Sequence, residues 1–187
     1  CAEAISMSAR SVSVIDGVTN LVSTAVAAGS GPWAIAINPV TNKVYVTNYL
    51  SANVTVIDGA TQAAATINTG MNPVAIAINP VTNQVYVANT GSHTVTVIDG
   101  ATNGTNTISA GTGPVAVAVN PVTNKVYVAN NGSNTVTVID GVDNNTTAVN
   151  VGANPTNVAV NAVTNKIYVA NYGSNNVTVI DGTTNDA

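Results

Sequence analysis

Charge is what this sequence lacks most. Charged residues make up 6% of the 187 positions, against roughly 25% in an average globular chain. The four Lys and Arg residues cannot neutralise many phosphates, so nucleic acid is excluded as a partner. The single cysteine excludes an intramolecular disulfide and a Cys-rich zinc site. No apolar run reaches the roughly 18 residues that a membrane-spanning helix requires, so we expect no transmembrane segment.

Apolar residues and asparagine are abundant instead. Hydrophobic residues make up 45% of the chain, and 28 residues are Asn. This apolar content is enough to build a core, which argues against disorder. The segment from Asn38 to Lys43 returns at 79–84, 120–125 and 161–166, a step of 41 residues. The segment Val-Thr-Val-Ile-Asp-Gly at 54–59 keeps the same step at 95–100, 136–141 and 177–182, with a variant copy at 12–17. The chain is therefore an internal repeat.

Each repeat predicts four short strands. In the first complete copy these follow Pro32, begin at Lys43, begin at Val54 and cover the looser segment 64–68. Asn-Pro and Asp-Gly pairs between them are typical of tight turns. Four antiparallel strands in about 40 residues are typical of a propeller blade, whereas a solenoid repeat is usually shorter or contains a helix. One blade cannot bury both of its faces, so the blades are expected to stack around an axis.

The second strand of each repeat carries a family resemblance. Tyr45-Val46-Thr47-Asn48 and the Tyr-Val-Ala-Asn copies at 86–89, 127–130 and 168–171 resemble the YVTN β-propeller repeat. The resemblance implies a propeller of about seven blades. It also implies a bacterial or archaeal secreted, cell-surface or surface-layer protein.

The blade count does not close within the chain. We expect an all-β fold, a single partial β-propeller domain over 1–187 with about four to five blades. Complete blades are expected at 32–70, 73–111 and 114–152, and partial terminal blades at 3–29 and 155–182, with a degenerate strand at Glu3–Met7. Two explanations stay open. The chain is part of a longer one, or it is a homo-oligomer in which one chain completes another.

No residue pattern predicts a catalytic or transition-metal site. A lone histidine, His93, has no cluster of further metal ligands in the sequence. Five aspartates recur in the repeated Ile-Asp-Gly turn, which favours a structural role in the turns: Asp16, Asp58, Asp99, Asp140 and Asp181. We expect no cofactor. Calcium stays open, because aspartate, asparagine and backbone oxygens suit a hard cation.

A binding face is expected where two sets of loops share one rim. These are the loops that enter the first strand of each blade and the loops between second and third strands. Trp33, Tyr49 and Tyr172 differ from their repeat equivalents, and exposed aromatics at a rim favour contact with a partner. The candidate residues of this face are Trp33, Tyr49, Met71, Asn72, His93, Asn131, Asn154 and Tyr172.

The sequence favours a non-catalytic β-propeller scaffold that is extracellular or at the cell surface. Its expected work is protein–protein or glycan contact and self-assembly. The alternative is a propeller enzyme of the lyase or lactonase kind with a site in the central channel. It is disfavoured because the inner strands carry Ala, Val, Ile, Asn and Pro rather than His or acidic groups. Cys1 leaves a lipid anchor open, although an accidental fragment boundary is the favoured explanation.

Overall fold

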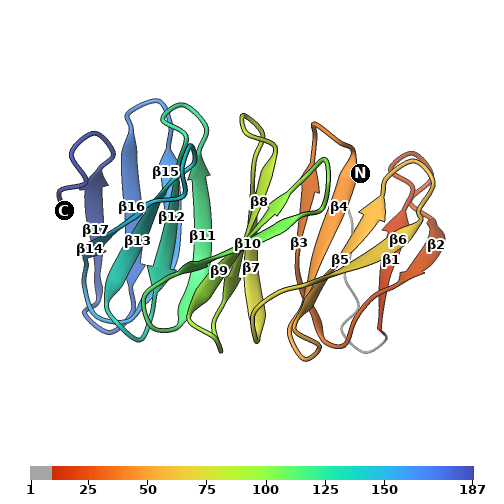
Figure 1. Cartoon of the computed structure of the whole chain (residues 1–187), viewed down its shortest axis with the longest axis horizontal. Helices are drawn as coiled ribbons and strands as arrows, with labels where there is room; N and C mark the ends of the chain where they lie inside the picture. Colours follow the sequence, from red (N-terminus) through yellow and green to blue (C-terminus); the bar gives the residue numbers. More distant parts are fainter. Residues whose placement is uncertain (1–9) are drawn as a thin grey trace.

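The computed structural model describes residues 10–187, which form seventeen β-strands and no helix. The successive sheets stand side by side along the molecule (Figure 1). Among these residues no helix is long or apolar enough to cross a bilayer. The expectations for Cys1 and for a strand at Glu3–Met7 lie outside the described residues.

Three four-stranded antiparallel sheets form the middle of the molecule, each with its strands in chain order. The first sheet contains β3 (Pro32–Asn38), β4 (Lys43–Asn48), β5 (Asn53–Asp58) and β6 (Ala64–Asn68). The second contains β7 (Pro73–Asn79), β8 (Gln84–Asn89), β9 (Thr94–Asp99) and β10 (Thr105–Ser109). The third contains β11 (Pro114–Asn120), β12 (Lys125–Asn130), β13 (Thr135–Asp140) and β14 (Thr146–Asn150).

Two smaller sheets flank the three complete ones. The N-terminal sheet pairs β1 (Ser11–Ile15) with β2 (Val22–Ala27). The C-terminal sheet contains β15 (Pro155–Asn161), β16 (Lys166–Asn171) and β17 (Asn176–Asp181). We number the five sheets as blades 0 to 4 in chain order, so that β1 and β2 form blade 0.

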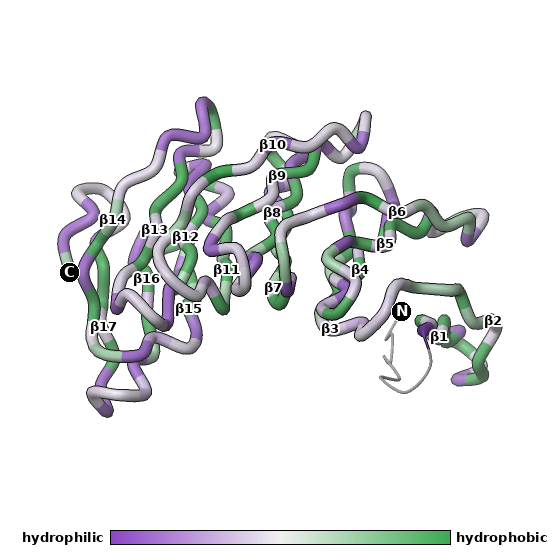
Figure 2. The backbone as a smooth tube through the Cα atoms, turned by 60° about the horizontal axis from the view of Figure 1, so that its bottom comes forward, coloured by the Kyte–Doolittle hydropathy of each residue, from purple (hydrophilic) through white to green (hydrophobic). Residues whose placement is uncertain are grey.

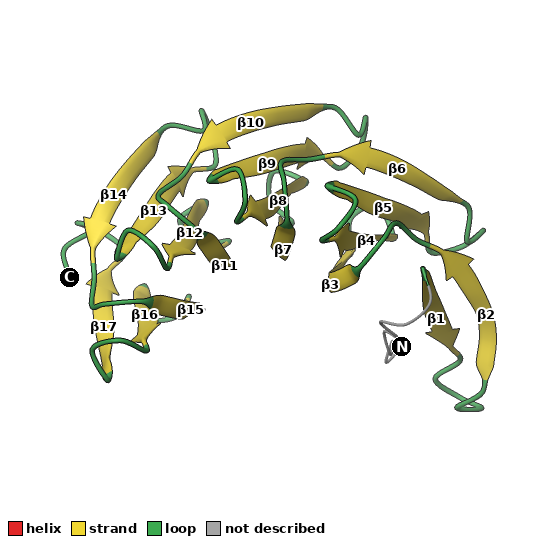
Figure 3. Cartoon of the chain, turned by 90° about the horizontal axis from the view of Figure 1, so that it is seen from below, coloured by secondary structure: helices red, strands yellow, loops and turns green. Residues whose placement is uncertain are grey.

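The five blades fan out as an open arc (Figure 3). The inner strands β3, β7, β11 and β15 lie on the concave side, and the outer strands β2, β6, β10 and β14 lie along the convex side. Blade 0 and blade 4 stand at the two ends of the arc with a wide gap between them. The prediction of an all-β propeller with four-stranded antiparallel blades, incomplete at both ends, is confirmed.

The core lies between blades rather than within any one of them. Tyr45 and Val54 of blade 1 pack in one buried cluster with Val85, Val87 and Ile98 of blade 2. Blades 2 and 3, and blades 3 and 4, repeat this arrangement. Hydrophobic stretches follow the strands, whereas the turns are mostly hydrophilic (Figure 2). Blades 1 to 4 thus each have a tyrosine face and an opposite valine–isoleucine face, and the next blade covers the tyrosine face of blades 1, 2 and 3.

The asparagine content has a conformational cause. Fifteen residues other than glycine have positive φ, and all but three of them are Asn; the exceptions are Ala52, Gln62 and His93. Asn tolerates the left-handed region better than other residues with a Cβ, because its short amide bonds locally to the backbone. One such residue near the end of most turns lets the chain reverse direction in few residues.

Candidate functional site

Charged side chains gather at one end of the blades. Lys43, Lys125 and Lys166 begin the second strands and pair in register with the aspartates that end the third strands. We call this end the acidic rim. It holds the seven described aspartates, Asp16, Asp58, Asp99, Asp140, Asp143, Asp181 and Asp186.

The opposite end, the entry rim, is almost free of charge. Its loops are 28–31, 49–52, 69–72, 90–93, 110–113, 131–134, 151–154 and 172–175. These loops contain no Asp, Glu, Lys or Arg. They lie against each other in pairs, since the Tyr49 N–H donates to the Gly31 carbonyl (2.8 Å) and the Thr90 N–H donates to the Asn72 carbonyl (3.0 Å). The loops that enter the first strands and the loops between second and third strands therefore lie on the same rim.

Trp33 and Tyr49 form an aromatic pair on this rim. Their ring centroids lie 5.7 Å apart with an interplanar angle of 36°. Trp33 stands at the start of the inner strand β3, and it is 51% exposed. Tyr49 directly follows β4, and its position is fixed by the Gly31 contact. The pair presents aromatic surface at the mouth of the arc's concave side.

Three further residues extend the aromatic pair. The Asn72 side-chain amide donates to the Tyr49 carbonyl at 3.3 Å, which places the next loop against the pair. Met71 precedes Asn72 and is exposed, as is Leu50 beside Tyr49. The sequence analysis did not include Leu50. Its signal was available, because the equivalent positions in the later blades are Gly91, Gly132 and Gly173.

The other predicted residues lie further along the entry rim. His93 Nδ1 accepts a hydrogen bond from the Gly113 N–H at 3.1 Å. His93 therefore acts as a hydrogen-bond acceptor between two neighbouring loops of the rim. The Asn131 side chain donates to the Pro155 carbonyl (3.2 Å), and the Asn154 N–H donates to Asn134 Oδ1 (2.8 Å).

Tyr172 lies in blade 4, and blades 2 and 3 stand between it and the aromatic pair. It is 79% exposed and lines a shallow hollow at blade 4 with Thr156, Asn175 and Asn176. The structure thus brings Trp33, Tyr49, Met71 and Asn72 together and leaves His93, Asn131, Asn154 and Tyr172 elsewhere on the rim.

The repeated aspartates accept hydrogen bonds inside their own turns. Asp58 Oδ1 accepts from the N–H groups of Ala60 (2.9 Å) and Thr61 (2.8 Å) and from the Thr61 hydroxyl (3.0 Å). These bonds, led by the backbone bond from Thr61, lower the pKa of Asp58. Asp16 and Asp99 repeat the pattern. Within residues 10–187 no group of three or more His, Cys, Asp and Glu side chains is placed to hold a metal ion.

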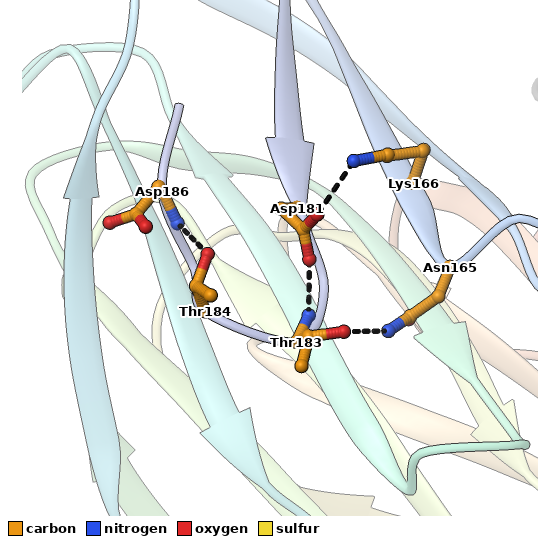
Figure 4. Close-up of polar contacts among 6 residues, drawn as sticks. All are labelled: Asn165, Lys166, Asp181, Thr183, Thr184 and Asp186. Carbon is orange, nitrogen blue, oxygen red and sulfur yellow. Dashed lines mark hydrogen bonds and ion pairs between the residues drawn. The ribbon is translucent and has the colours of Figure 1, made fainter.

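The last of these turns differs because its aspartate, Asp181, also forms an ion pair with Lys166 (Figure 4). Lys166 Nζ is 2.6 Å from Asp181 Oδ2, and the Thr183 N–H donates to Asp181 Oδ1 at 2.8 Å. The lysine is the main cause, and the backbone bond the second, of a pKa of about 2 for Asp181.

The inner strands make the concave wall of the arc, and this wall is uncharged. The inner strands β3, β7, β11 and β15 contain no ionisable side chain. Alanines such as Ala75 pack toward the bulkier Val117 and Val119 of the following blade, which lets the blades converge near the axis. A ligand on this side meets apolar surface, amides and the aromatic pair.

A family match gives this geometry a context. Residues 11–149 match the family described as Lactonase, 7-bladed beta-propeller. No curated protein matches the sequence.

Solved structures share the fold at low identity. Dihydro-heme d1 dehydrogenase NirN, in complex with DHE, is similar with a TM-score of 0.82 and 14% identity over 96% of this chain and 40% of that one. Hydrazine synthase of Kuenenia stuttgartiensis is similar with a TM-score of 0.76 and 24% identity, over 83% of this chain and 47% of that one. A functionally unknown protein from Desulfotomaculum acetoxidans DSM 771 is similar with a TM-score of 0.72 and 15% identity, over 92% of this chain and 62% of that one. This chain therefore spans about half the length of the structures it resembles.

The interpretation as a non-catalytic extracellular scaffold for protein or glycan contact and self-assembly is wrong. The family match is to lactonase propellers, so it favours the enzymatic alternative. The error came from treating an uncharged inner wall as the absence of a site, although such a wall can bind an uncharged ligand. The matched residues 11–149 run from blade 0 to blade 3 and make up well over half of the 187 residues, so the chain belongs to the lactonase seven-bladed β-propeller family.

Proposed function

We propose that the chain forms the ligand-binding part of a lactonase-type propeller. In this proposal a small uncharged lactone binds at the entry rim of blade 1, with its ring against Trp33 and Tyr49. The observation that carries the proposal is the pairing of the exposed Trp33 with the partly buried Tyr49 beside a concave wall free of charge. The family match over 11–149 supports the choice of a lactone.

The charge distribution supports a neutral ligand. Recognition of a phosphate or carboxylate generally uses Arg or Lys at the contact. The three described lysines lie at the acidic rim, at the far end of the strands from Trp33, and the one described arginine, Arg10, belongs to blade 0, where its carbonyl accepts the Ala28 N–H. A cyclic ester without a charged substituent needs only apolar contact and a few donors, as most small-molecule sites provide. The Asn72 side-chain amide already contacts the Tyr49 carbonyl.

An incomplete ring explains why the chain resembles only part of larger structures. Tyr168 of blade 4 is 40% exposed, whereas Tyr45, Tyr86 and Tyr127 are fully buried by the blades that follow them. We therefore propose that residues 1–187 are one partial propeller domain and that a further blade of the same repeat covers Tyr168. We also propose that the repeat is of the YVTN type, from the Tyr-Val-Ala-Asn copies.

The proposal is tested by lactone hydrolysis and its dependence on the aromatic pair. Acid release from δ-decalactone above the uncatalysed rate is expected, together with weaker or absent release from a phosphorylated aldonolactone. Trp33→Ala should lower kcat/KM for δ-decalactone at least fivefold. Tyr172→Ala removes an exposed aromatic from the same rim three blades away and should leave kcat/KM within a factor of two. Hydrolysis of no neutral lactone, or equal effects of the two substitutions, contradicts the proposal.

A further inference from the structure

Two of the three grooves between successive blades from blade 1 to blade 4 are bridged by a lysine. Lys43 Nζ of blade 1 donates to the Gly100 carbonyl at 2.9 Å and lies 3.3 Å from Asn103 Oδ1 of blade 2. Lys125 of blade 3 makes the same two contacts with blade 4, to the Gly182 carbonyl (2.9 Å) and Asn185 Oδ1 (3.2 Å). In both grooves one ammonium group thus meets one backbone carbonyl and one asparagine oxygen.

Carboxylates flank this ammonium position. The pKa of Asp58 is lowered chiefly by its Thr61 backbone bond, and that of Asp99 by its Thr102 backbone bond; Lys43 adds a smaller Coulombic lowering to each. Lys43 therefore lies between an aspartate of its own blade and one of the next. The groove is built for a cation that donates N–H bonds.

The groove between blades 2 and 3 lacks its lysine. Gln84 stands at that position, and its Oε1 accepts from the Tyr86 hydroxyl (2.7 Å) and the Thr82 hydroxyl (3.3 Å) of its own blade. The two acceptors that correspond to those of Lys43 are the Gly141 carbonyl and Asn144 Oδ1. Asn144 Oδ1 is buried and has no hydrogen-bond partner. A buried acceptor without a partner destabilises the fold.

The acceptors of this groove have the geometry of the bridged ones. Asn144 has φ 63°, beside 62° for Asn103 and 64° for Asn185. Asp99 and Asp140 flank the groove, and Asp140 lies close enough to contribute to the raised pKa of Tyr86, which burial raises first, to about 12. The third described lysine, Lys166, pairs with Asp181 in blade 4.

We infer that the groove between blades 2 and 3 is a binding site for a small primary ammonium ion. The ion takes the position that Lys43 and Lys125 fill in the neighbouring grooves, and it donates N–H bonds to the Gly141 carbonyl and Asn144 Oδ1. An N–H donor is favoured over a metal ion, because a hard cation needs six or more oxygen ligands at shorter distances. This site lies at the acidic rim and does not depend on the lactone site.

Thermal unfolding with matched chloride salts tests the inference. Methylammonium chloride, which donates N–H bonds, should raise the Tm of the wild-type chain by about 3 °C near saturation. Tetramethylammonium chloride at the same concentration has no N–H group and should not do so. Gln84→Lys should raise the Tm without added amine and remove the methylammonium response, because its own ammonium then fills the site.

Two further variants make the result decisive. Asn144→Gly keeps the positive φ and removes the acceptor, so its methylammonium response should be lost. Lys43→Gln copies the glutamine of the groove between blades 2 and 3 into the first groove and should enlarge the response. An equal Tm rise from both salts, an unchanged response in Gln84→Lys or no response of the wild type would overturn the inference.

Discussion

Tyr127 and Tyr168 occupy the same position in successive blades, yet Tyr127 is fully buried and Tyr168 is 40% exposed. Tyr127 lies in a cluster with Val158, Ile167 and Val169 of blade 4. Tyr168 belongs to the tyrosine face of blade 4, beside the exposed Val177 and Val179. The following blade, and not the tyrosine's own sheet, therefore buries this side chain.

The two tyrosines should differ in their contribution to stability. Tyr127→Ala leaves a cavity between two blades and should lower the free energy of unfolding by about 3–5 kcal/mol, as for other buried aromatics. Tyr168→Ala removes a half-exposed ring and should cost about 1 kcal/mol or less. Urea unfolding monitored by circular dichroism measures both.

Equal losses would show a different arrangement in solution. If Tyr168→Ala destabilises the chain as strongly as Tyr127→Ala, another sheet already covers blade 4. In that case the exposed face described here does not exist in the purified protein.

Ala52 is a second position where the repeat predicts an effect. It has φ 51°, a region that costs an alanine about 1 kcal/mol relative to Asn or Gly. At the equivalent position Asn134 Oδ1 accepts the N–H of Asn154, so Ala52→Asn should gain an acceptor for the Asn72 N–H. We expect a Tm increase of about 2–4 °C. Ala101→Asn, in an exposed turn with ordinary φ, is the control and should change little.

Acid should destabilise the chain through its turn aspartates. Asp181 has a folded-state pKa of about 2, below its ordinary 3.8, chiefly because of Lys166. A group with a lowered folded pKa stabilises the fold above its unfolded pKa, and this stabilisation is lost as the pH falls through the folded pKa. The Tm should therefore decrease between about pH 4 and pH 2. Asp16, Asp58 and Asp99 have lowered pKa values and add to the same trend.

The Lys166 contribution can be separated by a substitution. In Lys166→Met the pKa of Asp181 should rise toward its ordinary value, which carboxyl NMR titration measures directly. An Asp181 titration that is the same with and without Lys166 would refute the assigned cause.

The repeat made the blade architecture predictable. Motifs such as Tyr45–Asn48 and Asn53–Asp58 recur at a fixed step, so strand type and pairing follow from pattern and turn chemistry. The exposed faces at the arc ends were also foreseeable, because burial of a tyrosine such as Tyr168 needs a following blade.

The site was only partly predictable. Trp33 and Tyr49 could be selected because they break the repeat, but the contact between their rings depends on how loop 49–52 crosses loop 28–31. Gln84 breaks the repeat as clearly, yet its consequence is three-dimensional. The sequence does not show that position 84 faces Asn144, sixty residues further on, until neighbouring blades are stacked.

The central claim is that a neutral lactone binds against Trp33. Trp33 is the only tryptophan in the chain, so its intrinsic fluorescence reports on that position alone. Titration with δ-decalactone should change the emission saturably, with at least fivefold weaker binding in Tyr49→Ala and unchanged binding in Tyr172→Ala. Emission that stays constant up to the solubility limit of the lactone would contradict the account.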